Sequence, residues 1–385
     1  MEYFLTDEQK MIKDLCRKIA EEKIKPIAAE LDEKEEFPWE VMKTLAQSDL
    51  FRIFIEEKYE GMGGGTFEFA IATEELSRAC GGVAVCYAGS GLGAYPIGLF
   101  GTDEQKKRFL PELASGKKLA AFALTESEAG SDAGAIKTTA KKEGGDYIIN
   151  GTKQWITNGG EAETYVVFVV TDKNKGARGT SALIVEKGTP GFEFGKKEKK
   201  LGIRASTTRE LSFTDCRVSR QNLLGKEGMG FIIALQTFDK SRPGIAAQAV
   251  GIAQGALDLA VGYARERKQF GKSISSFQGI QFMLADMATQ IEAARALTYA
   301  VAREIDAGVK KIAKDSAMAK LFASDVAMKV TTDCVQIFGG YGYMKDYPIE
   351  KYMRDAKITQ IYEGTNQIQR NIIALNLLKE SKGRK

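Results

Sequence analysis

The spacing of apolar residues changes twice along the chain and predicts three consecutive regions. Up to about residue 118 it has the period of a helix, as on the face formed by Ile12, Leu15, Cys16, Ile19 and Ala20. Thr6 with Gln9, and Thr102 with Gln105, have the spacing of a capping box, which predicts that helices begin at both places. We therefore expect residues 1–118 to form an α-helical domain.

Between residues 119 and 226 the helical period is replaced by short runs rich in β-branched and aromatic residues. These runs are YIINGTKQWI, TYVVFVVTD, TSALIVEKG, FEFG and ELSFTDCRV, and turn sequences such as KGTPG separate them. Strands at this spacing, without long helices between them, predict a small antiparallel β-barrel or sandwich as the middle domain.

The helical period returns from residue 227 to the end, at residue 385. Runs with this period cover 231–267, 277–306, 312–338 and 366–378, which predicts an antiparallel four-helix bundle with a frayed basic tail, KESKGRK. The expected fold class is therefore α+β and multidomain. No glycine-rich G-x-G-x-x-G follows a strand, and no G-x-x-x-x-G-K-[ST] occurs, which excludes dinucleotide-binding βαβ and P-loop folds.

Composition excludes several kinds of function. The 385 residues include no histidine, which excludes Ser-His-Asp and Cys-His nucleophiles and histidine metal sites. The five cysteines contain no Cys-x-x-Cys pair, so we expect packed, reduced thiols and no metal. The net charge of +4 is too small to indicate a nucleic-acid partner.

The N-terminal segment, MEYFLTDEQKMIKDL, is acidic and amphipathic, unlike a signal peptide. We find no apolar run of the length that a bilayer span needs. The expectation is a soluble, cytoplasmic protein without membrane insertion.

Two segments of the middle region have features of a ligand site. In AFALTESEAGSDAG (121–134), small residues and hydroxyls allow a ligand to approach the backbone, although a structural turn is an equal alternative. In NGTKQWITNGG (150–160), Trp155 and Thr157 offer an aromatic face and a hydroxyl to a planar ring. A lone tryptophan is more often a core residue.

Two further segments lie in the C-terminal region. Arg267 in ERKQFG suits a phosphate, although a solvated charged turn is the more common explanation of such a segment taken alone. Glycines in QIFGGYGY (336–343) predict a break after a helix. In IYEGTNQIQR (361–370), Glu363 between Tyr362 and Gly364 is either a charge at a helix N-terminus or a base on an accessible loop.

Taken together, these motifs resemble those of the acyl-CoA dehydrogenases, flavoenzymes that oxidise acyl-CoA thioesters. The resemblance covers essentially the whole chain and includes LTESEAGSDAG, NGTKQWITNGG, FDKSRPGIAAQAVG, ERKQFGK and MRDAKITQIYEGTNQIQR in the family's order. The short- and medium-chain branch, typified by butyryl-CoA dehydrogenase, is the most similar.

The resemblance assigns a role to each matching residue. Along the FAD flavin and against its ring it implies Phe122, Leu124, Thr125, Gly130, Ser131, Trp155, Ile156 and Thr157. For the diphosphate and adenosine end, in part from a neighbouring subunit, it implies Arg267, Phe270, Gln278, Gln336, Gly339 and Gly340, and Thr365 and Gln367 complete the cofactor site. Contacts to the CoA ester are implied for Ser131, Asp239, Arg242, Tyr362 and Gly364.

The same resemblance implies the reaction. Glu363 takes the α-proton, N5 of FAD accepts the β-hydride, and electrons pass to electron-transfer flavoprotein. Some family members carry the base as a glutamate at the position of Ser241, and the serine here is consistent with Glu363 in that role. Burial by substrate is expected to raise the pKa of Glu363 towards working pH. A homotetramer is implied as well.

Several alternatives remain open. Ala88, Gly89, Ser90 and Gly91, on a segment expected to form a loop at the floor of the acyl pocket (82–96), leave room for a medium straight chain or a compact ring. The substrate can therefore be an alicyclic CoA ester of anaerobic aromatic degradation. An oxidase or monooxygenase, an enoyl-CoA reductase and a DNA-protective relative share the scaffold. Glu363 disfavours the oxidases, and the small net charge disfavours the DNA-protective role.

Overall fold

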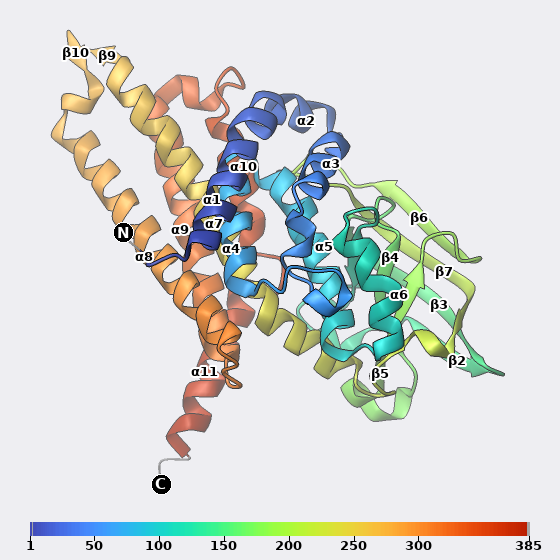
Figure 1. Cartoon of the computed structure of the whole chain (residues 1–385). Helices are drawn as coiled ribbons and strands as arrows, with labels where there is room; N and C mark the ends of the chain where they lie inside the picture. The colour runs from blue at the N-terminus through green and yellow to red at the C-terminus, as the bar shows by residue number, and fades with distance from the viewer. Residues whose placement is uncertain (2, 383–385) are drawn as a thin grey trace.

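The computed structural model describes residues 1 and 3–382 of the chain. Helices, then strands, then helices again follow one another along it, as expected from the change of period. In Figure 1 the mostly helical N-terminal region lies between the β-sheet on one side and the long C-terminal helices on the other. The three-part α–β–α fold is confirmed. The domain limits 1–118, 119–226 and 227–385 stay predictions.

The N-terminal region consists of six α-helices within the described residues. Both expected capping boxes are present, because the Thr6 and Thr102 hydroxyls each accept a hydrogen bond from a backbone N–H three residues later, at 3.2 Å. The helices are α1 (Asp7–Ile19), α2 (Ala28–Lys34), α3 (Trp39–Gln47), α4 (Thr66–Ala79), α5 (Gly81–Phe100) and α6 (Asp103–Ala114).

The expectation of a loop at residues 82–96 is wrong, because this segment is part of the buried helix α5. Its glycines permit close packing against neighbouring elements. A Cβ on Gly93 would lie 2.6 Å from the backbone nitrogen of Ala121, and one on Gly89 would lie 2.9 Å from a methyl group of Thr157. Burial between other elements therefore stabilises a helix that glycine content alone disfavours.

The middle region forms one sheet of eight strands, largely antiparallel, as expected. It differs in two places: β1 pairs with β4 in parallel over four residues, and β2 meets β4 in parallel at Thr139 and Val170. The strands are β1 (Ala120–Ala123), β2 (Thr139–Glu143), β3 (Asp146–Thr157), β4 (Thr164–Val170), β5 (Thr180–Glu186), β6 (Phe192–Lys197), β7 (Thr208–Ser219) and β8 (Leu223–Leu224).

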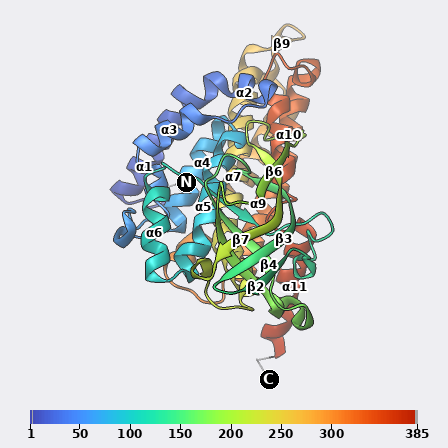
Figure 2. The ribbon, with the colours of Figure 1, turned by 90° about the vertical axis from the view of Figure 1, so that its right-hand side faces the viewer.

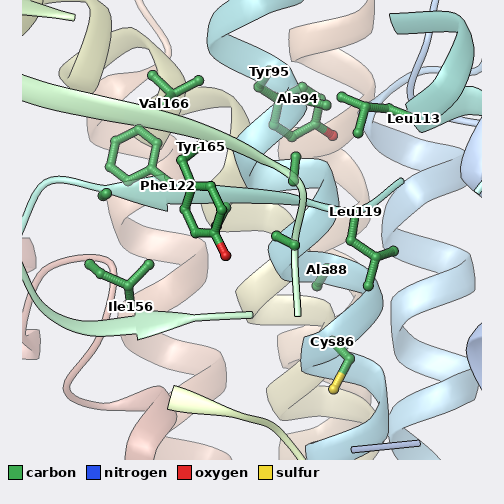
Figure 3. Close-up of a cluster of buried hydrophobic side chains, with 14 of the residues drawn as sticks. Cys86, Ala88, Ala94, Tyr95, Leu113, Leu119, Phe122, Ile156, Tyr165 and Val166 are labelled. Carbon is green, nitrogen blue, oxygen red and sulfur yellow. The ribbon is translucent and has the colours of Figure 1, made fainter. Parts of the chain in front are cut away.

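The inner face of the sheet belongs to the same hydrophobic core as the N-terminal helices. Phe122, Ile156 and Tyr165 from the strands cluster with Cys86 and Tyr95 of α5 (Figure 3). Figure 2 looks onto this sheet, with the N-terminal helices on one side and α9–α11 on the other.

The described part of the C-terminal region contains five α-helices, one more than the four expected. The additional helix is α10, which is short and follows the glycine-rich turn after α9. The described part of the tail is helical up to Lys382, so fraying is not seen there, and residues 383–385 lie outside the described residues. The helices are α7 (Gly230–Glu266), α8 (Gln278–Asp306), α9 (Ala313–Phe338), α10 (Ile349–Thr359) and α11 (Asn366–Lys382), with the small hairpin β9 (Lys268–Gln269) and β10 (Lys272–Ser273) between α7 and α8.

Two helices, α5 and α7, are long and apolar enough to cross a membrane by length and composition, which corrects the expectation that no such run exists. In their most apolar windows, 72% and 78% of the residues are buried inside the protein. Their apolar character is therefore explained by packing in the core of the fold.

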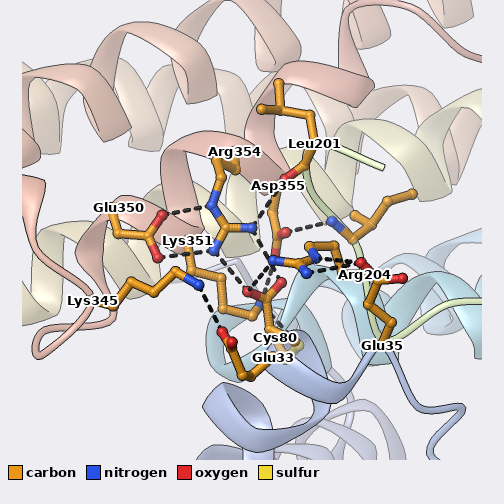
Figure 4. Close-up of polar contacts among 12 residues, drawn as sticks. Glu33, Glu35, Cys80, Leu201, Arg204, Lys345, Glu350, Lys351, Arg354 and Asp355 are labelled. Carbon is orange, nitrogen blue, oxygen red and sulfur yellow. Dashed lines mark hydrogen bonds and ion pairs between the residues drawn. The ribbon is translucent and has the colours of Figure 1, made fainter. Parts of the chain in front are cut away.

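A polar junction joins the three regions (Figure 4). Asp355 of α10 accepts a hydrogen bond from the backbone N–H of Ile203 in the middle region, at 2.6 Å, and pairs with Lys351. Arg354 of α10 pairs with Asp32 of α2 at 2.7 Å. The charged groups at this junction are mostly buried, and we refer to these five residues as the three-region junction.

All five cysteines are free and buried, as expected. Cys16 lies on α1, Cys80 precedes α5, Cys86 is on α5, Cys216 is on β7 and Cys334 is on α9.

Candidate active site

Glu363 lies in the turn between α10 and α11. Its backbone has a φ of 51°, a left-handed conformation that is uncommon for residues other than glycine, and the following Gly364 has a φ of 90°. One carboxylate oxygen accepts a hydrogen bond from Ser241 of α7 at 2.6 Å. Positions 241 and 363 are 122 residues apart in the sequence, yet their side chains meet. A carboxylate at position 241 or at position 363 would therefore lie in the same part of the site.

The carbonyl groups of the Glu363 turn are held from three elements. Gln369 of α11 donates to the Glu363 and Gly364 carbonyls at 3.0 and 2.9 Å. Lys320 of α9 donates to the Gly364 carbonyl at 2.9 Å, and Arg242 of α7 approaches the Glu363 carbonyl at 3.4 Å. Among the hydrogen bonds of the described residues, none uses the Glu363 N–H. This donor is therefore available to a ligand.

The surroundings of Glu363 bring its pKa close to neutrality. Burial raises the pKa from 4.5 to about 7, against the opposing effects of the Ser241 hydroxyl and the positive charges of Arg242 and Lys320. Desolvation disfavours the carboxylate and is the largest cause. A carboxyl group with such a pKa is suited to accept and release protons at physiological pH.

The residues expected near the CoA ester fall into two groups. Arg242 is 3% exposed and pairs with Asp239 at 3.1 Å, one turn earlier on α7. Tyr362 directs its hydroxyl to Gln248 of the same helix. These residues and Gly364 surround Glu363. Ser131 is exposed on the loop after β1.

The residues expected along the flavin ring lie on β1, β3 and the loop after β1. The backbone N–H of Gln154 in β3 donates to the Thr125 carbonyl at 2.8 Å. A register shift in β3 between Lys153 and Ile156 leaves Trp155 57% exposed, with a φ of 57°. Phe122, Leu124 and Ile156 are buried, Thr125 and Thr157 are half-buried, and Gly130 is exposed.

Phe238 of α7 connects this group to Glu363. Its ring lies 5.2 Å from that of Phe122, and the guanidinium of Arg242 lies 5.8 Å from its centroid. Its carbonyl is 3.4 Å from the Ser241 hydroxyl, which in turn donates to Glu363. The structure thus brings the predicted base and part of the predicted flavin surface together in one chain.

A third group of predicted residues lies elsewhere. Arg267, Gly339 and Gly340 line one cavity of about 480 Å³ at the far end of the C-terminal helices, beside the β9–β10 hairpin. In Figure 1 this hairpin and the sheet lie on opposite sides of the molecule. Phe270 at the hairpin tip is 93% exposed, and Gln278 and Gln336 are exposed as well.

The two remaining cofactor predictions lie at the start of α11. The Thr365 hydroxyl accepts a hydrogen bond from the Ile368 N–H at 3.3 Å, as an N-cap does. Gln367 is exposed on the first turn of the helix.

Sequence reasoning did not identify the buried residues that support the loops of the site. Lys320 and Gln369 support the Glu363 turn, and Lys153 supports the loop after β1 by donating to the Leu124 carbonyl at 3.0 Å and pairing with Glu126 at 2.7 Å. Both lysines are 0% exposed. Lys320 gives one signal, a charged residue within the apolar run AMAKLFA, whereas Lys153 has polar neighbours in GTKQW and gives none. Charged residues are usually on the surface.

Comparison with known protein families gives a match to each of the three regions. "Acyl-CoA dehydrogenase, N-terminal domain" matches residues 6–117, the "middle domain" matches residues 121–216 and the "C-terminal domain" matches residues 228–378.

Individual relatives match over nearly their full length. The short-chain specific acyl-CoA dehydrogenase of Clostridium acetobutylicum is 52% identical over 375 residues, which cover 97% of this chain and 99% of the relative. The acryloyl-CoA reductase (NADH) of Anaerotignum propionicum is 51% identical over 381 residues, which cover 98% of this chain and 96% of the relative.

A solved structure has the same fold. A chain in the structure of the electron transferring flavoprotein of Acidaminococcus fermentans, a study of flavin-based electron bifurcation, superimposes with a TM-score of 0.96 at 52% identity, covering 98% of this chain and 100% of that one. The chain described here therefore belongs to the acyl-CoA dehydrogenase family of FAD-containing oxidoreductases, in its short-chain branch.

Proposed function

We propose that the protein catalyses the FAD-dependent α,β-dehydrogenation of acyl-CoA thioesters to 2-enoyl-CoA, with Glu363 removing the α-proton. The observation that carries the proposal is the carboxylate of Glu363, half-buried in a strained turn, with one oxygen fixed by Ser241 and a pKa of about 7. Strained backbone at such a position is typical of functional residues.

The residues of the turn have separate tasks in this reaction. Ser241 orients one carboxylate oxygen and leaves the other for the α-hydrogen. The free Glu363 N–H is suited to donate to the thioester carbonyl as negative charge develops on its oxygen. Arg242 and Gln369 fix the turn from its carbonyl side, so that the donor and the base keep their relative position.

The residues present fit FAD. The register shift in β3 leaves the ring of Trp155 exposed to solvent, close to Thr157 and the buried Ile156. In the cavity at the other end, Arg267 stands next to two glycines whose Cβ positions would meet no atom within 4 Å. The planar ring of the cofactor suits the exposed face of Trp155, and its anionic diphosphate suits the cavity with Arg267. When bound, FAD supplies the acceptor for the hydride that leaves the β-carbon.

The substitution Glu363→Gln tests the proposal, because it keeps the shape and the Ser241 contact but removes the base. Turnover with butyryl-CoA should fall at least about 10³-fold while FAD content and substrate binding stay near the wild-type values. Glu8→Gln, an exposed acid on α1, is the control and should keep full turnover. Turnover of Glu363→Gln within tenfold of the wild type would refute the assignment.

The preferred acyl group is a short or medium straight chain, with an alicyclic ester as the alternative. Ala88 and Gly91 lie in the buried helix α5, and the Phe69 ring fills the space beside Gly91, so these residues do not distinguish the two. Similarity to a short-chain specific relative favours the straight chain. Anaerobic titration with a panel of linear and cyclic acyl-CoA esters, followed by loss of the flavin absorption, distinguishes them: the preferred ester bleaches the flavin at the lowest concentration.

We further propose that electrons pass to an electron-transfer flavoprotein. The similarity to a chain in the Acidaminococcus fermentans flavoprotein structure supports this partner. The similarity to an acryloyl-CoA reductase supports the opposite direction as an alternative, since the same residues serve both. Rates with oxidised flavoprotein plus acyl-CoA and with NADH plus enoyl-CoA separate the two. Rapid reoxidation by oxygen would indicate an oxidase.

A homotetramer is the proposed assembly. Apolar side chains are exposed at the β9–β10 hairpin and on the protruding helix α11 (Figure 1), namely Phe270, Leu375, Leu377 and Leu378. The separation of Arg267 from Trp155 within one chain is explained if each FAD contacts two chains. Analytical ultracentrifugation tests this: flavin should be lost as the assembly dissociates.

A further inference from the structure

Lys320 is a buried lysine on α9 whose environment is unusual for its charge. Its side chain is 0% exposed, and lysine is almost never fully buried unless it is paired. Both contacts of its ammonium, among the described residues, are with neutral oxygens: the Gly364 carbonyl and the Asn366 amide oxygen, each at 2.9 Å. An unpaired buried charge is costly, so its retention calls for a physical reason.

Both acceptors belong to the turn that carries Glu363. The Gly364 carbonyl directly follows the base, and Asn366 begins α11. Asn366 is itself held by Ser324 and Asp325 of α9, to which its amide donates at 2.9 and 2.8 Å. Lys320 therefore connects α9 to the C-terminal side of the Glu363 turn, opposite to the side that Ser241 and Arg242 of α7 hold.

The charge of Lys320 also acts on Glu363. The ammonium lowers the pKa of Glu363. Burial lowers the pKa of Lys320 from 10.5 to about 7, and the Glu363 carboxylate opposes this effect, so the lysine carries its full charge only below this pH. The other charged or titratable groups that face Glu363 are Arg242 on α7, Tyr95 on α5 and the adjacent Tyr362. Asp325 of α9 and Asp239 of α7 act on Lys320 and Arg242 in turn. Among the described residues, Arg242 and the protonated form of Lys320 are therefore the two cations that bias this carboxyl towards its ionised form.

We propose that Lys320 is a positioning residue for the catalytic base: it fixes the Glu363–Gly364 turn from α9, and its protonated form supplies positive charge that favours ionisation of Glu363. A merely structural lysine would serve only the first task. The inference rests on the proposed function, because it concerns the reactivity of Glu363 as a base.

The substitution Lys320→Met tests the proposal, since methionine fills a similar volume without a charge or donor. In anaerobic stopped-flow experiments with butyryl-CoA, flavin reduction at saturating substrate should slow by about tenfold or more, while the substrate dissociation constant changes less than threefold. The acidic limb of the rate–pH profile should move up by about one pH unit, because a nearby cation has been removed.

Two variants serve as references. Lys320→Arg keeps the charge, so its acidic limb should stay at the wild-type pH even if its rate falls. Lys329→Met, on the exposed side of the same helix in an ion pair with Asp333, should leave both the rate and the profile unchanged. Should Lys320→Met not fold, Lys320→Gln replaces it, since glutamine keeps a donor for the Gly364 carbonyl but not the charge.

The outcomes separate this inference from the proposed function. If Glu363→Gln is inactive but neutral substitutions of Lys320 leave the acidic limb in place, Lys320 is only structural and the inference is overturned. If Lys320→Met raises the dissociation constant as much as it lowers the rate, a role in substrate binding replaces it. If Glu363→Gln retains turnover, the assignment of the base fails, and this inference fails with it.

Discussion

At the scale of single residues, the site places a titratable group where its charge and its backbone are both unfavourable. Glu363 has a left-handed backbone conformation and a carboxyl group that burial makes harder to ionise. Each of these costs stability, and both are tolerated because neighbouring side chains fix the turn. Function and stability should therefore oppose each other at this residue.

The opposition predicts a pH-dependent gain in stability for Glu363→Gln. Because the pKa of Glu363 is raised from 4.5 to about 7, the folded protein retains a proton that the unfolded chain has lost between these values. Its contribution to stability is therefore present at low pH and is lost as the pH rises through 7. The variant should exceed the wild type in Tm by about 2 °C or more at pH 8 and by less at pH 5, in thermal scans of the holoenzyme. An equal difference at both pH values contradicts the raised pKa.

A second prediction at this scale concerns Lys153, which burial brings to a pKa of about 8 although Glu126 pairs with it. Glu126 also accepts hydrogen bonds from the N–H groups of Lys137 and Thr138, so the pair closes the loop after β1. Lys153→Met leaves a largely buried carboxylate without its cation and should lower the free energy of unfolding by about 3 kcal/mol.

Lys137→Met is the matched control, because it breaks an ion pair with Glu128 in the same loop in which both side chains are 75% exposed. Its cost should be too small to measure in urea unfolding, because solvent screens an exposed pair. Equal costs for the two variants would show that burial of the Lys153 pair is unimportant.

At the scale of elements, helix α5 shows how packing decides a structure that local propensity does not. Residues 82–96 were expected to form a loop, but they are helical, and several glycines of this segment are the points at which other elements approach it. The capping boxes at Thr6 and Thr102 were predictable, because they involve residues three apart in the sequence. Close approach between α5 and a strand that begins more than twenty residues later leaves no such local signal.

Two glycines of α5 should therefore respond in opposite directions to alanine. A Cβ on Gly93 would lie 2.6 Å from the Ala121 nitrogen and 2.7 Å from the Ala120 Cβ, so Gly93→Ala should destabilise by about 1–3 kcal/mol. Gly98 has nothing within 4 Å of that position, and Gly98→Ala should stabilise the helix by about 0.5–1 kcal/mol. Urea unfolding midpoints measure both. A shift of the same sign would contradict the packing argument.

Helix α10 was also missed, for a different reason. Its run, IEKYMRDAKIT, is short, begins after Pro348 and places charged residues inward, where Lys351 and Asp355 are 5% and 1% exposed. A prediction from hydrophobic periodicity assumes that charged residues are exposed, and it therefore cannot identify such a helix. Its buried charges are satisfied by contacts within the three-region junction and, for Lys351, also by the Cys80 sulfur at 3.1 Å.

At the scale of the whole molecule, that junction predicts how strongly the three regions depend on one another. Asp355→Asn leaves Lys351 buried without its carboxylate and weakens the contact with Ile203, so the free energy of unfolding should fall by about 3 kcal/mol. Lys345→Ala is the control, because both side chains of its ion pair with Glu33 are 65% exposed and the pair should make no measurable contribution to stability. Chemical denaturation monitored by tryptophan fluorescence measures the two.

The candidate site was predictable where motifs carry it and not where the fold assembles it. Glu363, Arg242 and Trp155 stand in recognisable segments. That Ser241 donates to Glu363, and that Lys320 reaches the same turn, depends on α7 and α9 lying together beside α11. The predicted cofactor residues lie in two distant places of the folded molecule, and this separation likewise depends on the whole fold.

The burial of all five thiols has a practical consequence for following how this protein opens. Since each thiol is buried, a thiol-modifying reagent can react with it only after the surrounding structure has opened. The five cysteines lie at five different places in the fold, so each one reports on its own surroundings. Variants retaining one cysteine at a time would turn the order of labelling into a map of local opening, with Cys216 reporting on the sheet and Cys334 on the long C-terminal helices.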